Sequence, residues 1–225
     1  MTNYNTPGMG KVGATWEARG YHGAGNVGDL IGSIAGRVAV VCGNGKGVFD
    51  ELALVRGVYD YDKLVVFPAN DVGIYIDRLD HWVTLHSEKF PAWRAARYAM
   101  GYTHDVRYHS ERPEPDFPLD YLWSGLGPMT FALSGYFAMQ IAYIMGAAEI
   151  ILCGCPGDRI PRFWETDPRP DNFGYGGGST QSDKNINQQL VSEMVRLPEL
   201  REVTCSMSGW TRTFLGGMKW QHSQR

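Results

Sequence analysis

The sequence contains few cysteines, and no set of them is placed to bind zinc. Only four cysteines occur among 225 residues, at positions 42, 153, 155 and 205. Cys153 and Cys155 have CxC spacing, but no second Cys/His pair stands nearby to complete a zinc site. Such limited cysteine use is typical of a reduced protein rather than a disulfide-stabilised secreted one. We therefore expect free structural cysteines, a cytoplasmic location and no metal site built from these residues.

Targeting and membrane-spanning signals are also missing. The amino-terminal residues are rich in Thr, Asn and Gly and lack the apolar core of a signal peptide. No apolar run reaches the roughly 18 residues that a membrane span needs. The longest such stretch, residues 131–145, contains Ser134 and Gln140 and is expected to be a buried helix. The formal net charge is −3, so no general basic field favours nucleic acid or an anionic membrane.

Nucleotide and hydrolase motifs are also missing from the turn after the first predicted strand and from the serine positions. There is no Walker P-loop, and a GxGxxG pattern starting at Gly43 and Gly45 would need a third glycine where Val48 stands. There is also no GxSxG nucleophile elbow, which excludes a hydrolase serine of that type. The pattern therefore does not favour an NAD site of the usual kind or a serine hydrolase.

What the sequence does contain is an alternation of strand-like and helix-like segments. Apolar runs predict strands at 37–42, 64–67, 81–86, 106–108, 150–153 and 203–206, and helical spacing predicts helices at 48–56, 72–79, 88–100, 133–145 and 185–197. This order predicts an α/β fold with a doubly wound, mostly parallel sheet and helices on both faces. We expect residues 1–36 to form a glycine-rich arm. Residues 37–206 should form one domain with a lid-like loop at 156–181, and residues 207–225 should form a tail.

Candidate binding residues follow the predicted strands. The turn Gly43-Asn44-Gly45 follows the first strand, and Asn70 follows the second. Ser134-Gly135 begins the long apolar helix. Glycines permit close backbone approach, and a helix start offers N–H groups to an anion. The alternative is purely structural: a glycine turn that connects strand to helix, and polar residues that cap helices.

Further candidates are His86, at the expected carboxyl end of the third strand, and several residues after the fifth strand. A histidine in such a place can act as a general base near neutral pH, although a single histidine is more often structural. Asp158 could bind a substrate hydroxyl, while Arg159 and Arg162 could clamp a phosphate. Tyr175 in the predicted loop could stack on a base or sugar. A solvated loop with ordinary packing is the alternative for these four residues.

These residues carry a family resemblance. The order of Gly43-Asn44-Gly45, Asn70, the Ser134-Gly135 helix and the following strand to Gly154 resembles the small single-Rossmann bacterial sialyltransferases that use CMP-sialic acid. It is also similar to the related motility-accessory-factor and 6-hydroxymethylpterin diphosphokinase-like domains. The resemblance implies a single Rossmann-like, nucleotide-binding domain. It further implies that Gly43, Asn44, Gly45, Asn70, Ser134 and Gly135 bind the nucleotide.

The resulting expectation is a transferase that uses a nucleotide or a nucleotide sugar, of the CMP type, as donor substrate. His86 is the candidate catalytic residue, and no cofactor is assigned. The family takes a general-base histidine from the region after the last strand, where this chain has only His222. The alternative is therefore a non-catalytic nucleotide- or metabolite-binding module, or an assembly protein that retains the fold. A homo-oligomer is possible, and whether a metal is needed stays open.

Overall fold

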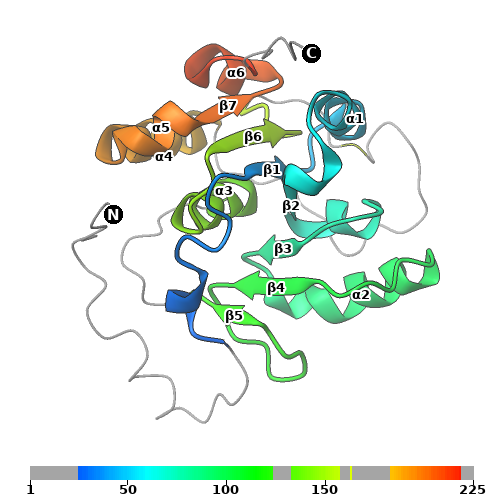
Figure 1. Ribbon diagram of the computed structural model, residues 1–225. Coiled ribbons are helices and arrows are strands. Elements are labelled where there is room, and N and C mark those ends of the chain that lie inside the picture. The colour runs from blue at the N-terminus through cyan, green and yellow to red at the C-terminus, as the bar shows by residue number, and fades with distance from the viewer. Residues whose placement is uncertain (1–24, 124–132, 158–162, 164–182, 219–225) are drawn as a thin grey trace.

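The protein contains two parallel sheets that lie side by side, so that their strands form one continuous series. The computed structural model describes residues 25–123, 133–157, 163 and 183–218. One sheet has the order β2-β1-β6-β7 and the other β3-β4-β5. A parallel bridge between Ala69 and Val83 places β3 beside β2. The seven strands therefore lie in the order β7-β6-β1-β2-β3-β4-β5, as Figure 1 shows from top to bottom. Their bounds are β1 Val38–Cys42, β2 Leu64–Pro68, β3 His81–Thr84, β4 Arg107–Ser110, β5 Tyr121–Leu122, β6 Glu149–Cys153 and β7 Thr204–Ser206.

This strand order contains a topological switch point between β1 and β6. From β1 the chain builds outward through β2 to β5, then returns to place β6 on the other side of β1 and adds β7 beyond it. Every strand pair is parallel, including β1 with both β2 and β6. All carboxyl ends consequently lie at one edge. In doubly wound sheets the crevice outside this edge at the switch point is the usual place for a ligand.

Helices cover both faces of the sheet. The α-helices are α1 Val48–Val58, α2 Phe90–Ala99, α3 Ser134–Ile144, α4 Asp183–Arg196, α5 Pro198–Val203 and α6 Gly209–Leu215. Short 3-10 helices are η3 Val27–Leu30, η4 Tyr61–Lys63, η5 Asn70–Ile74 and η6 Ser87–Lys89. The first helix shows how sequence spacing determines packing: Val48, Leu52 and Val55 recur at helical spacing and are all buried.

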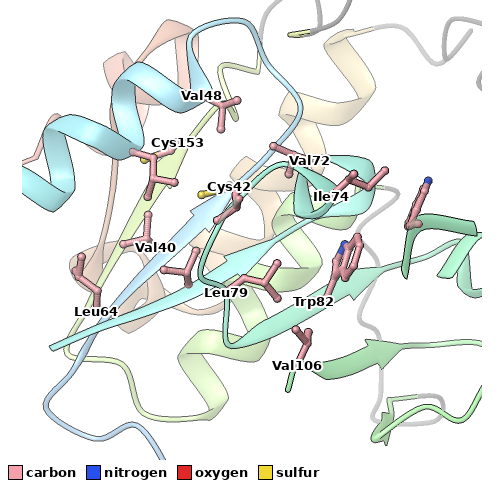
Figure 2. Close-up of a cluster of buried hydrophobic side chains, with 14 of the residues drawn as sticks. Val40, Cys42, Val48, Leu64, Val72, Ile74, Leu79, Trp82, Val106 and Cys153 are labelled. Atoms are coloured by element: carbon pink, nitrogen blue, oxygen red, sulfur yellow. The ribbon is translucent and has the colours of Figure 1, made fainter. Parts of the chain in front are cut away.

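The two faces of the central strands form two hydrophobic cores. In β1, Ala39 and Val41 pack with α3, whereas Val40 and Cys42 pack with α1 and the segment from η5 to Leu79. Neighbouring residues of a strand point to opposite faces, so a strand covered on both sides must be apolar throughout. Figure 2 shows Val40, Cys42 and Cys153 in the second cluster. The α/β fold with helices on both faces, predicted from the alternating pattern, is confirmed.

A fully buried arginine joins α2 to the segment after β2. Arg97 donates from Nη1 to the carbonyl oxygen of Gly73 at 2.8 Å and to that of Ile76, and from Nη2 to that of Asp77 at 2.9 Å. Its guanidinium also lies 5.0 Å from the ring centroid of Tyr102. A buried charge needs such partners to offset the loss of water. Arg97 therefore satisfies carbonyls that lie outside regular strands and anchors the connection that leads into β3.

Some elements differ from the sequence prediction. The helix expected at 72–79 is instead the short η5, and the third strand ends at Thr84 rather than at His86. The two-residue strand β5 and the helices α5 and α6 were not predicted, because none of them has enough residues to show a clear period. Within the predicted arm, η3 buries Val27 and Leu30 against the core. Within the predicted tail, residues 209–215 form α6.

Candidate functional site

The turn after β1 packs directly against the turn after β6. Gly43 donates its N–H to the carbonyl oxygen of Cys153 at 2.7 Å, and Gly45 donates to that of Gly154 at 2.8 Å. A Cβ on Gly43 would lie 2.5 Å from the Gly154 oxygen, and one on Gly45 would lie 2.8 Å from the same oxygen. Only glycine fits such an approach of two backbones. These two N–H groups therefore serve the protein's own carbonyls at the switch point.

The side chain of Asn44 connects the β1 turn to the end of β2. Its Nδ2 donates to Asp71 Oδ1 at 2.5 Å, and its Oδ1 accepts the N–H of Val72 at 3.3 Å. The carbonyl oxygen of Asn44 accepts the N–H of Phe163 at 2.9 Å. The Phe163 ring packs edge-on against Tyr75, with 5.5 Å between ring centroids. Asn44 thus connects the turn after β1 to η5 and, through its carbonyl oxygen, to Phe163.

Asn70 occupies a backbone conformation that few residues other than glycine adopt. Its φ is +64°, the only positive value among the described residues other than glycine. Asparagine tolerates this left-handed region better than most side chains. The Asn70 Oδ1 accepts the hydroxyl of Thr84 at 2.8 Å, and its carbonyl oxygen accepts Trp82 Nε1–H at 2.6 Å. Both contacts join the end of β2 to β3.

Ser134 and Gly135 begin α3 against the ends of β3 and β6. The Ser134 Oγ accepts the N–H of Leu85 at 3.1 Å, and this serine is buried. A Cβ on Gly135 would lie 3.1 Å from Cys155 Sγ. The residue before the helix, Leu133, makes no side-chain capping hydrogen bond. The first intrahelical bond is donated by Phe137, so the N–H groups before it have no acceptor within the helix.

Cys155 is a residue of this site that the sequence reading did not select. Its sulfur lies between the turn after β1 and the start of α3: a Cβ on Gly43 would be 2.6 Å from it, and one on Gly135 would be 3.1 Å from it. Burial, followed by the nearby Glu51 carboxylate, raises the pKa of the Cys155 thiol to about 12. The thiol is therefore protonated at neutral pH and acts as an apolar spacer. Its CxC spacing with Cys153 was the only sequence signal for Cys155, and the expectation of a structural cysteine did not place it at this edge of the sheet.

The turn after β6 is also held from the other side, by α6. Thr211 Oγ1 donates to the carbonyl oxygen of Cys155 at 2.8 Å, and the Thr211 N–H donates to that of Pro156 at 3.0 Å. Thr211 Oγ1 lies 2.7 Å from Ser206 Oγ at the end of β7. Nothing in the local sequence identifies the contact of Thr211 with this turn, because Cys155 and Pro156 lie 55 or more positions away in the chain.

His86 lies just beyond β3, at the beginning of η6. Its N–H donates to Thr84 Oγ1 at 3.0 Å. The side chain is 47% exposed, and its Nδ1 lies 3.6 Å from Glu88 Oε1. This imidazole is accessible to solvent. It lies at the same edge of the sheet as Asn70, because Thr84 contacts both residues.

The predicted residues are therefore linked along one edge. Cys155 joins Gly43 to Gly135, Leu85 joins Ser134 to β3, and Thr84 joins Asn70 to His86. Asp71, which is buried and bonded to Asn44, is a further acidic group at this edge. The four residues predicted to contact substrate, Asp158, Arg159, Arg162 and Tyr175, lie outside the described residues.

No group of three or more His, Cys, Asp or Glu side chains in the described ranges could hold a metal ion. No helix in the part of the chain that the structure describes is long and apolar enough to cross a membrane. Comparison with known proteins gives no assignment, since neither a protein-family model nor a curated protein matches the chain.

Proposed function

We propose that this protein binds a nucleotide or nucleotide sugar at the carboxyl edge of its sheet and transfers a group from that donor. The carrying observation is the contact of the α3 start with the turn after β6, through Gly135 and Cys155 Sγ, a sulfur that also lies against Gly43 in the turn after β1. This contact brings a helix N-terminus to the place where doubly wound sheets usually bind ligands. The resemblance to bacterial sialyltransferases supports a CMP-type donor among the nucleotides.

The start of α3 is better suited to an anion than the start of α1. In α1 the first turn contains Asp50 and Glu51, and Glu51 Oε2 already accepts the N–H of Gly154 at 2.7 Å. The first turn of α3 contains no acidic residue. Helix N-termini attract phosphate through unpaired N–H groups and the positive end of the helix dipole. A donor phosphate would therefore bind at Ser134-Gly135, and the glycine turn after β1 would shape the floor below it.

In this proposal His86 is the group that handles a proton of the acceptor. It is exposed and linked to Asn70 through Thr84, and its Nδ1 lies 3.6 Å from Glu88 Oε1. A carboxylate near one ring nitrogen favours a base at the other. The predicted substrate contacts Asp158, Arg159, Arg162 and Tyr175 follow the strand β6 in the chain and complete the proposal on the acceptor side.

A binding experiment tests the donor site. Isothermal titration with CMP, UDP, GDP and ADP, and with the corresponding nucleotide sugars, should identify one preferred base. Ligand at a hundredfold excess over Kd should raise the free energy of unfolding by about 2.7 kcal/mol. Failure of every nucleotide to bind or to stabilise the protein would overturn the proposal.

A matched pair of substitutions tests whether the donor phosphate binds at the start of α3. Leu133→Asp and Leu133→Asn place the same shape at the N-cap of α3, where either side chain can accept a helix N–H. Only the aspartate adds a negative charge beside the expected phosphate. We expect about tenfold weaker nucleotide binding in Leu133→Asp than in Leu133→Asn, which corresponds to about 1.4 kcal/mol. Equal affinities would place the nucleotide elsewhere.

The second candidate is a binding module without transfer activity. It is favoured by the fact that Asn44, Asn70 and Ser134 all use side-chain oxygen atoms for protein contacts. Donor consumption distinguishes the two. The transferase should consume its nucleotide sugar, and His86→Ala should lose turnover while retaining affinity. A protein that binds but never consumes the donor, with or without His86, is the binding module.

A further inference from the structure

Two buried histidines and a tryptophan form a hydrogen-bonded chain away from the candidate site. Trp123 Nε1 donates to His109 Nδ1 at 3.0 Å, and His109 Nε2 lies 2.8 Å from His81 Nδ1. The histidines come from the neighbouring strands β4 and β3, in which His109 is paired with Val83. Trp123 is the residue after β5, and its ring packs on Phe137 of α3 with 6.5 Å between centroids. These three side chains therefore connect the strands β3, β4 and β5 to the helix that begins at Ser134.

The hydrogen bonds determine the tautomers of both rings. An indole nitrogen can only donate, so His109 Nδ1 must be the acceptor and carry no hydrogen. A neutral His109 then carries its hydrogen on Nε2 and donates to His81 Nδ1. His81 in turn carries its hydrogen on Nε2. These assignments follow from the network of hydrogen bonds.

One additional proton cannot enter this chain without breaking a hydrogen bond. If it binds His109, both ring nitrogens carry hydrogen, and Nδ1–H faces the indole N–H of Trp123. If it binds His81, that ring donates to His109 Nε2, and the hydrogen of His109 moves to Nδ1 with the same result. Only if His109 keeps its Nε2–H does the contact between the two histidines break instead. The bond from Trp123 is thus lost in two of three arrangements.

The surroundings increase the cost of that proton. His109 is completely buried beneath the Tyr121 ring at 5.0 Å, and His81 stacks on Phe67 at 4.7 Å. Burial, followed by the positive Arg107, lowers the pKa of His81 to about 4. Burial, followed by His81 and Arg107, lowers the pKa of His109 well below its usual value.

Charged groups on the neighbouring elements do not offset this cost. Arg37, before β1, also lowers the pKa of His81. Two nearby carboxylates are already engaged: Asp120 pairs with Arg107 at 3.1 Å, and Asp80 Oδ2 accepts the N–H of Val66 at 2.8 Å. The α3 helix contributes no charged side chain. No carboxylate among the described residues is bonded to either imidazole, so an added proton would have no counter-charge.

We propose that Trp123, His109 and His81 form an acid-sensitive lock, in which uptake of one proton releases the Trp123 indole and loosens β5 from the beginning of α3. This inference does not depend on the proposed donor site. The effect of acid would be local to Trp123, because the backbone bond from Trp123 N–H to the Ser110 carbonyl oxygen, at 2.8 Å, is not part of the hydrogen-bonded chain of side chains.

Nuclear magnetic resonance of protein labelled with 15N-tryptophan tests the lock. The sequence contains seven tryptophans, and Trp123→Phe identifies the Trp123 indole signal. As the pH is lowered, the Trp123 indole N–H should shift and exchange faster with water. The internal control is Trp82, whose Nε1–H bonds to the carbonyl oxygen of Asn70 at 2.6 Å in the other core. Its signal should change only at a lower pH, when the whole protein unfolds.

Substitutions complete the test. His81→Asn keeps an acceptor near the former Nδ1 but removes the less buried ring, so the Trp123 transition should move to lower pH. His86→Asn removes an exposed histidine and should leave the transition unchanged. The proposal is overturned if Trp82 and Trp123 change at the same pH, since acid then only unfolds the protein. It is equally overturned if His81→Asn leaves the Trp123 transition where it is.

Discussion

Leu85 donates its buried backbone N–H to Ser134 Oγ at 3.1 Å, across 49 positions in the chain. This bond joins the end of β3 to the first residue of α3. It also means that a serine expected to contact a ligand has a structural task of its own. Removal of the hydroxyl should therefore affect stability even when no nucleotide is present.

Ser134→Ala should lower the free energy of unfolding by about 1–3 kcal/mol, because the Leu85 N–H would stay buried without a partner. Ser134→Thr retains a hydroxyl and should cost less. Urea unfolding of both variants without ligand measures this effect. Equal stability of Ser134→Ala and the unchanged protein would mean that water replaces the serine.

Glycine at position 43 should stabilise the fold, because a side chain there has no room. Gly43→Ala would place a Cβ 2.5 Å from the Gly154 carbonyl oxygen and 2.6 Å from Cys155 Sγ, so β1 and β6 would have to move apart. We expect a loss of about 1–3 kcal/mol in the free energy of unfolding.

Gly57→Ala is the matched control for this substitution. Gly57 lies in α1, and a Cβ there would meet no atom within 4 Å. An exposed alanine in a helix should stabilise the protein by up to about 1 kcal/mol relative to glycine. Thermal unfolding of the two variants should thus give shifts of opposite sign, and a shift of the same sign would contradict the packing described for Gly43.

Two substitutions of Asn70 should separate backbone strain from hydrogen bonding. Asn70→Gly loses the bond to Thr84 but fits the positive φ of 64°. Asn70→Ala loses the same bond and also places a Cβ without local polar contacts in the left-handed region, at an added cost of about 1 kcal/mol. Chemical denaturation should rank the unchanged protein above Asn70→Gly, and Asn70→Gly above Asn70→Ala. If alanine were as stable as glycine, the φ of residue 70 would have to change in solution.

Stability should decrease on mild acidification because of the buried histidines. The pKa of His81 is about 4 in the folded protein, against about 6.5 in an unfolded chain. Below pH 6.5 the unfolded chain therefore takes up a proton that the folded protein does not. The associated stability is fully present above pH 6.5 and is lost as the pH falls toward 4, by about 1.4 kcal/mol per pH unit and histidine.

Urea unfolding at several pH values between 7.5 and 5 measures this slope. His81→Asn should reduce it, and His86→Asn, which removes a half-exposed histidine outside this buried pair, is the control. A slope that is the same in all three proteins would assign the acid sensitivity to other groups.

The elements with strong apolar patterns were predictable from local sequence. The segments around β1, β2 and β6 are apolar on both faces, and α1 and α3 show buried positions at helical spacing. The strand β5 was missed because only two residues pair, and η5 replaced a longer helix because Arg97 binds the carbonyl oxygens of Gly73 and Ile76. A carbonyl bonded to a side chain from another helix carries no signal in the local sequence.

For the candidate site, the sequence predicted only the edge of the sheet at which it lies. Parallel strands separated by helices place all their carboxyl ends at one edge of the sheet, so Asn44, Asn70 and His86 had to lie at that edge. Their hydrogen-bond partners could not be predicted. Asp71 and Thr84 hold the two asparagine side chains, and these contacts arise only when neighbouring strands are in register.

By itself the sequence determined the α/β class, because the periods of strands and helices are local properties of the chain. Tertiary structure decided which groups at the edge are engaged and which are accessible. Gly43 and Gly45 give their N–H groups to the turn after β6, while the first turn of α3 is brought beside them through Cys155. The physical reason is that hydrogen-bond donors are satisfied by whatever comes within reach, and for β1 that neighbour is β6, more than a hundred residues later.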